Sequence, residues 1–88
     1  MTRKELIKEM ISGYEGRKWQ LEIEISNYEH HLATQGRSAF SPLFRDAITT
    51  NRKQLDMAIV LLELLTVEQK RLDSTVNLTE DTQNHAQN

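Results

Sequence analysis

The chain has 88 residues, enough for one small domain, and it contains no Cys, which excludes disulfides, zinc–thiolate sites and thiol chemistry. Its formal net charge of -2 gives no overall attraction to nucleic acid or to an anionic membrane. Residues 1–10 form a charged helix start rather than a signal peptide, and the longest apolar run is too short to cross a bilayer. We therefore expect a cytoplasmic protein without a membrane partner.

A first helix is predicted over residues 3–34. Thr2 and Glu5 have the spacing of a capping box, in which the Thr2 hydroxyl accepts from the Glu5 amide. Side chains that can pack then recur at steps of three and four, which indicates one face of a continuous helix. Gly13 and Gly16 interrupt neither the phase nor the helix; they mark either a weak point or a close approach of another backbone. The face comprises Ile7, Ile11, Tyr14, Lys18, Leu21, Ile25, Tyr28 and Leu32.

A turn is predicted over residues 35–41 and a second helix over residues 42–74. Gly36 suits the position just past a helix end, and Ser41 and Pro42 suit the N-cap and the first helical position that follow. Because the connection is short, the two helices are expected to lie antiparallel as neighbours. Residues 77–88 are polar and without periodicity, which predicts a disordered tail after one hairpin domain over residues 1–76.

The most apolar stretch of the chain lies at residues 54–72, inside the second helix. One set of its apolar positions continues the stripe that starts at Phe44, and a second set falls outside that stripe. A helix that is apolar nearly all round must be covered on several sides, which one neighbouring helix cannot do. We therefore predict an all-α fold, a long antiparallel helical hairpin that dimerises into a four-helix bundle. The residues predicted to mediate self-association are Trp19, Ile23, Met57, Val60, Leu64 and Val67.

Two aromatic residues are candidates for binding a different protein. Trp19 lies four residues before Ile23, roughly opposite the main apolar stripe of the first helix. Large aromatics concentrate in interfaces, so this pair belongs either to the dimer core or to a docking patch for another protein. Phe40, at the tip of the turn, is the second candidate.

Charged side chains follow the flanks of both helices. Glu15, Glu22 and Glu29 are spaced seven residues apart, and so are Arg45 and Arg52. Equivalent flanks meet in an antiparallel pair, so Glu29 is expected to pair with Arg45 or Arg52. An acidic row that imitates a phosphate backbone is the alternative, but basic residues are interleaved with it.

The first half of the second helix is locally basic, which makes nucleic acid a possible ligand. The acidic side chains of Asp46 and Asp56 lie in the same region, and no aromatic stacking platform accompanies it. The candidate contacts to phosphate are Arg37, Arg45, Arg52 and Lys53.

No catalytic, cofactor or metal site can be assembled from the sequence, so we do not expect an enzyme. His30 and His31 are adjacent, and adjacent helical residues point about 100° apart, so they cannot share a metal within one chain. Only a symmetric dimer that brings two copies of His31 together could form a metal-binding site. The sequence has no Gly-rich phosphate loop and no nucleophile elbow.

In size, capping style and hairpin layout, residues 2–76 resemble the small accessory proteins encoded by temperate phages of enteric bacteria. Those proteins are often helical, lack Cys and bind a host protein. The resemblance implies inhibition or redirection of a host machine, such as a nuclease or a defence complex, by stoichiometric binding. The leading hypothesis is a non-enzymatic, self-associating helical adaptor or inhibitor, and the alternative is a dimeric nucleic-acid-binding protein.

Overall fold

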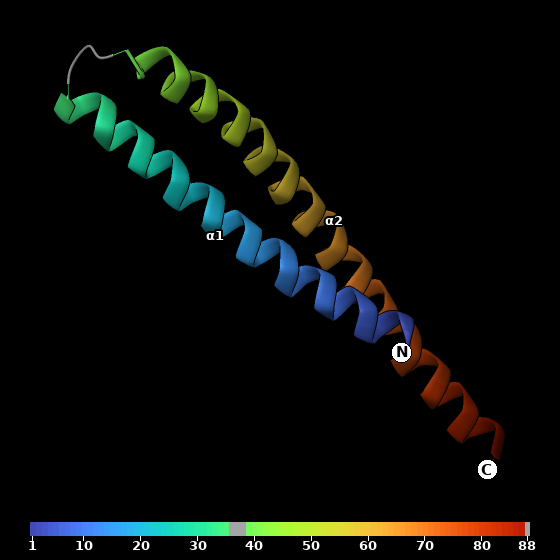
Figure 1. Cartoon of the computed structure of the whole chain (residues 1–88). Helices are drawn as coiled ribbons and strands as arrows, with labels where there is room; N and C mark the ends of the chain where they lie inside the picture. Colours follow the sequence, from blue (N-terminus) through green and yellow to red (C-terminus); the bar gives the residue numbers. More distant parts are fainter. Residues whose placement is uncertain (36–38, 88) are drawn as a thin grey trace.

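The computed structural model describes the backbone of residues 1–35 and 39–87 and the side chains of residues 1–35 and 39–74. It consists of two long helices, α1 (Arg3–Gln35) and α2 (Ser41–Gln87), which lie antiparallel and side by side (Figure 1). The residues described include no strand. This confirms the prediction of an all-α helical hairpin. The rod measures 75 × 17 × 17 Å, so its cross-section holds two helices and no third layer.

The start of α1 is capped as the sequence predicts, and the start of α2 is shifted by one residue. The Glu5 amide donates to the Thr2 hydroxyl over 3.1 Å, and the Leu6 amide donates to the Thr2 carbonyl over 3.0 Å. In α2 the first such bond runs from the Phe44 amide to the Phe40 carbonyl, over 3.0 Å. Phe40, rather than Ser41, is therefore the N-cap, and the predicted cap was wrong by one position. Pro42 still lies in the first turn, where its missing donor breaks no helical bond.

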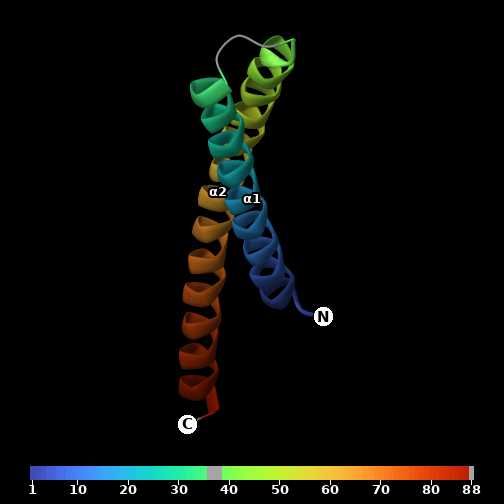
Figure 2. The ribbon, with the colours of Figure 1, turned by 60° about the vertical axis from the view of Figure 1, so that its left-hand side comes forward.

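Two further predictions concern the ends of the helices. Gly36, predicted to end the first helix, lies outside the described residues. At its C-terminal end α2 continues to Gln87 and passes beyond the start of α1, whereas residue 74 was the predicted helix end and a disordered tail was expected from residue 77 (Figure 2). The sequence contains no Pro and no Gly after Pro42, so no helix-breaking residue stops the backbone hydrogen bonding there.

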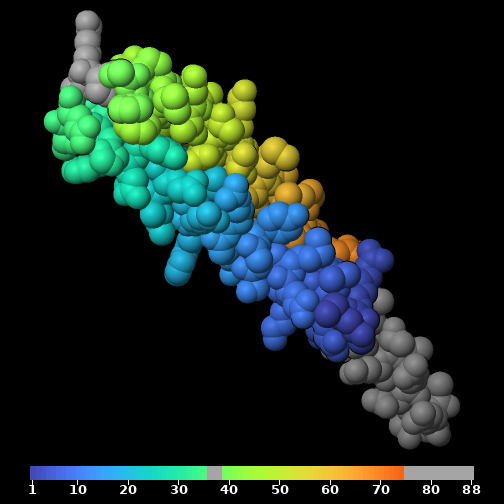
Figure 3. Space-filling model, viewed as in Figure 1, coloured from blue at the N-terminus to red at the C-terminus, as the bar shows by residue number. Residues whose placement is uncertain are grey.

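The two helices pack through the predicted stripes; in Figure 3 their side chains adjoin in the half of the rod near the turn, and toward its start α1 lies in front of α2. All eight predicted positions of α1 are buried or half-buried, and Leu21 is fully buried. α1 runs unbroken through both of its glycines, and a Cβ added at either would meet nothing within 4 Å. Within the described chain these glycines therefore mark neither a break nor a close contact. The buried apolar residues are Ile7, Leu21, Ile25, Ile48 and Ala58.

An aromatic cluster closes the hairpin near the turn. The Phe44 ring stacks on Tyr28 with 5.5 Å between ring centroids, and it also lies 5.8 Å from the His31 ring and 6.4 Å from the Phe40 ring. His31 is exposed, and its ring lies against Phe44 at the turn end of the hairpin. These contacts join the last turns of α1 to the first turns of α2.

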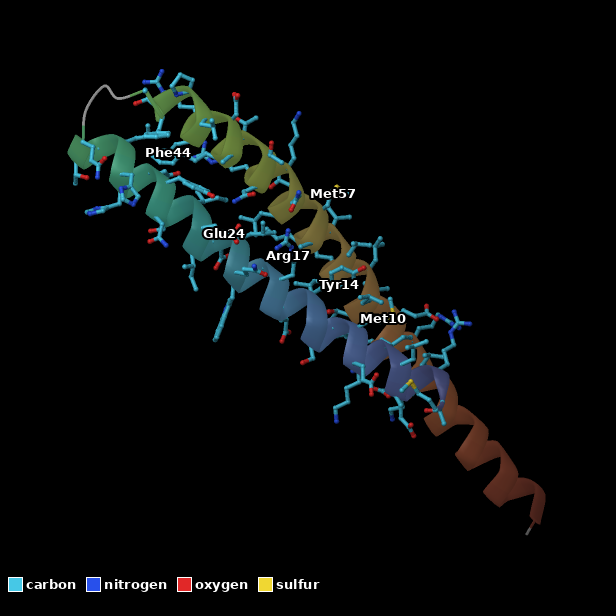
Figure 4. The ribbon with its side chains drawn as sticks, in the orientation of Figure 1. Met10, Tyr14, Arg17, Glu24, Phe44 and Met57 are labelled. Atoms are coloured by element: carbon cyan, nitrogen blue, oxygen red, sulfur yellow. The ribbon has the colours of Figure 1, made fainter. Side chains whose placement is uncertain are left out.

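Polar contacts between the helices set their register. The Arg52 guanidinium pairs with the Glu29 carboxylate at 2.5 Å, which confirms one of the two predicted pairings. The Asn51 side-chain amide donates to the Glu24 carboxylate at 3.0 Å in a partly buried position. Arg17 and Glu24 extend from α1 toward α2 in Figure 4. The Arg17 guanidinium donates to the side-chain carbonyl of Gln54 at 2.5 Å.

Candidate functional site

A stripe of apolar side chains runs along the outer side of α2. It consists of Met57, Val60, Leu64 and Val67, spaced by three, four and three residues, and we call it the α2 seam. Each of these side chains is between 52% and 66% exposed. Figure 4 shows Met57 on the edge of α2 that faces away from α1. The four residues predicted on α2 for self-association are thus brought together on one open surface.

The direction of the α2 seam follows from helix geometry. Two positions along a helix correspond to a rotation of about 200°. Val60 lies two positions after the buried Ala58 and two positions before the half-buried Leu62, so it points away from α1. A three–four–three spacing is the repeat by which two helices pack in a coiled coil. Lys53 and Arg71 occupy the next positions of the same repeat, so a basic residue bounds the seam at each end.

The flank of the seam nearer to α1 is already engaged within the chain. It carries Gln54 and Glu68 at its ends, and these contact Arg17 and Arg3 of α1 at 2.5 and 3.5 Å. Glu68 also pairs with Arg71 one turn later on α2. The hydrogen bond from Arg71 lowers the pKa of the Glu68 carboxyl below its ordinary value of 4.5, and the same bond raises the pKa of Arg71.

The opposite flank of the seam is open. It carries Asp56, Glu63 and Lys70, all of them exposed and seven residues apart. Over the described residues none of the three forms an ion pair. We call it the open flank. Sequence reasoning missed these residues as a group. Their seven-residue spacing from one another, one position before Met57 and Leu64, was a signal that could have found them.

Trp19 and Ile23 lie on a different outer surface. Ile23 stands between Leu21 and Ile25, two positions from each, and both of these are buried against α2. By the same geometry Ile23 points away from α2, and its side chain is 61% exposed, while that of Trp19 is 72% exposed. This pair therefore lies on the outer side of α1, whereas the α2 seam lies on the outer side of α2.

A shallow open groove adjoins the Trp19 side chain. It is lined by Ser12 and Gly16 of α1 and by Leu62 and Thr66 of α2, beside Trp19 itself. The predicted docking patch at Trp19 thus adjoins a concave surface to which both helices contribute. Phe40, the other predicted anchor for another protein, is 64% exposed and lies at the turn end of the rod.

The three candidate phosphate contacts that the structure describes do not form a uniform basic surface. Arg52 is engaged with Glu29, and Lys53 lies about 100° from it around α2. Arg45 shares a flank with Arg52, one heptad away. Arg37 lies outside the described residues.

The described part of the chain has neither a metal-binding cluster nor a membrane-spanning helix. Within residues 1–35 and 39–74, no group of three or more His, Cys, Asp or Glu side chains lies close enough to hold a metal ion. His30 and His31 meet edge to face, with 6.4 Å between their ring centroids. No helix in the described part of the chain combines the length and the apolar character needed to span a membrane.

Comparison with protein-family models, with curated proteins and with solved structures gives no match.

Proposed function

We propose that the protein is a non-enzymatic interaction module that works as a self-associating helical adaptor or inhibitor. Two copies pair through the α2 seam, and the pair binds a different protein through the surface around Trp19. The observation that carries this proposal is the α2 seam itself, with four apolar side chains in heptad spacing that are each more than half exposed.

The energetics of apolar burial support pairing through this surface. Monomeric proteins seldom expose a contiguous apolar patch of this kind. Full burial of one Val, Leu or Met side chain stabilises by about 1.5–3 kcal/mol, and a pair of seams contributes such side chains from both copies. Part of that gain offsets the loss of translational and rotational freedom. We therefore expect a dimer at micromolar concentration, with two-fold symmetry as the commonest arrangement of such pairs.

The second half of the proposal concerns a different protein. Pairing through the α2 seam leaves Trp19 and Ile23 facing outward on each copy, next to the groove formed with Leu62 and Thr66. Exposed Trp side chains beside a concavity are typical anchors of protein interfaces. In keeping with the resemblance to phage accessory proteins, we propose a host nuclease or defence complex as the class of target, bound stoichiometrically.

Light scattering coupled to gel filtration tests the proposal with two matched variants. Leu64→Glu and Ile23→Glu each place a carboxylate at a side chain that is 61% exposed, one on the α2 seam and one on α1. We expect wild type and Ile23→Glu to be dimers, and Leu64→Glu to be a monomer with unchanged helical circular dichroism. A wild-type monomer at high concentration would refute self-association.

Binding to another molecule is tested by capture from a bacterial lysate with and without nuclease treatment, using wild type and Trp19→Ala. A protein that is captured by wild type after nuclease treatment, and lost with Trp19→Ala, supports the proposal. Capture that disappears on nuclease treatment and weakens steeply with salt would instead support the dimeric nucleic-acid-binding alternative.

A further inference from the structure

The open flank carries an asymmetric charge pattern that bears on how two seams meet. Its residues run acidic, acidic and basic along the chain, from Asp56 through Glu63 to Lys70. All three are exposed, and none of them has an ion-pair partner in the described part of the chain. In coiled-coil pairs, charges at these flanking positions set the relative orientation of the helices. The inference below rests on the proposed pairing through the α2 seam.

An antiparallel pair matches the two seams without a gap. When the two-fold axis passes beside Leu62, Met57 of one copy lies opposite Val67 of the other, and Val60 lies opposite Leu64. Every layer then combines two apolar residues, and no seam residue is left without an apolar counterpart. A hollow bounded by Asp56, Met57, Val60 and Leu61 lies at one end of the seam, where Val67 of the second copy would be seated.

The same register brings unlike charges together on the open flank. Asp56 of each copy lies opposite Lys70 of the other, which gives two attractive pairs related by the axis. Glu63 lies opposite its own counterpart, which gives one repulsive pair. The balance of the open flank therefore favours the antiparallel orientation.

A parallel pair has no such attraction. In that orientation the open flank of one copy meets the other flank of its neighbour, so Glu63 lies opposite Glu68 twice. Asp56 then lies opposite Leu61, where it has no basic counterpart. The ends of the seam do not discriminate between the orientations, because Lys53 and Arg71 meet basic residues in both.

We infer that two copies of the chain pair antiparallel along α2, with the two-fold axis beside Leu62, and that reciprocal Asp56–Lys70 ion pairs select this orientation. The molecule that covers the α2 seam is thus a second copy of the chain, because the charges of the open flank complement those of a second copy. The surfaces around Trp19 then lie on the two outer sides of the dimer, one on each copy.

A charge swap tests the inference, because Asp56 and Lys70 cannot substitute for each other within one chain. They are 14 positions apart, or about 21 Å along the helix, more than twice the Debye length of about 8 Å at physiological salt. We expect Asp56→Lys and Lys70→Asp each to raise the dimer dissociation constant about 3- to 10-fold, since each affects two pairs. The double variant restores the wild-type value to within about 2-fold if the pairing is antiparallel. Additive losses in the double variant would overturn the inference.

Site-specific crosslinking gives a second readout on the same protein. The chain has no Cys, so an introduced Cys is the only thiol. With a short bismaleimide, Glu63→Cys is expected to crosslink to itself, whereas Asp56→Cys and Lys70→Cys should crosslink only when the two variants are mixed. Self-crosslinking of Asp56→Cys alone would overturn the antiparallel register.

The two proposals fail in different ways. If wild type is a dimer by light scattering, but the swap is additive and mixed crosslinks do not form, the antiparallel register is wrong and self-association stands. If wild type is a monomer at high concentration, self-association itself is wrong, and the inference about orientation falls with it.

Discussion

Two apolar stripes of α2 are built from the same kinds of side chain and have different surroundings. The stripe that faces α1 includes the buried Ile48 and Ala58, whereas Val60 and Leu64 of the α2 seam are more than half exposed. The first stripe is covered by the same chain, because a short connection brings α1 alongside at little entropic cost. If a second copy covers the α2 seam, as we propose, the contribution of the seam to stability depends on protein concentration. The stripe that faces α1 therefore stabilises the hairpin, and the α2 seam is a surface to which another molecule can bind.

The largest expected effect comes from truncating one residue in each region. Leu21→Ala removes a fully buried side chain and should lower the free energy of unfolding by about 2–5 kcal/mol at every protein concentration. Leu64→Ala should change the free energy of unfolding of the isolated hairpin by no more than about 0.5 kcal/mol. It should, however, make the free energy of unfolding depend less on protein concentration. Urea unfolding followed by circular dichroism at two concentrations measures both. If Leu64→Ala were as costly as Leu21→Ala at high dilution, the seam would belong to the fold of the monomer.

The sequence predicts the interface between α1 and α2 well and the exposed surfaces only in part. All eight positions that the three–four periodicity predicts on α1 are buried or half-buried, because burial against one neighbouring helix imposes that period directly. The half-buried Glu24, which accepts from Asn51 of α2, is not among them. The same rule separates Met57, Val60, Leu64 and Val67 from the stripe. It does not show that these residues and Trp19 lie on different outer surfaces, since that requires the positions of both helices around their common core. The shifted cap at Phe40 depends on turn geometry that residue preferences do not fix.

The ion pair between Glu29 and Arg52 tests how much a polar contact adds to the packing of α1 against α2. Its atoms lie 2.5 Å apart, but both side chains are about half exposed, so solvent screens the pair. Glu29→Lys should lower the free energy of unfolding by about 0.2–1 kcal/mol at low salt, and adding Arg52→Glu should restore most of it. Urea titrations of the four-member cycle provide the measurement. Arg45→Glu is the matched control, since it lies on the same flank one heptad away and should restore less.

The smallest expected effect concerns Glu68, which lies between the two regions, on the flank of the seam that contacts α1. The hydrogen bond from Arg71 lowers the pKa of this carboxyl below 4.5, so the folded state holds the proton less tightly than the unfolded state does. The stabilisation from the ionised Glu68 is therefore fully present above about pH 4.5 and is lost as the pH falls through the lowered pKa. Glu68→Gln should consequently be less stable than wild type near pH 7, and the difference should shrink near pH 3. Thermal unfolding at the two pH values measures it, with Glu22→Gln, an exposed carboxylate on α1, as the control. A difference that stays the same at both pH values would show that Glu68 acts through the shape of its side chain rather than through its charge.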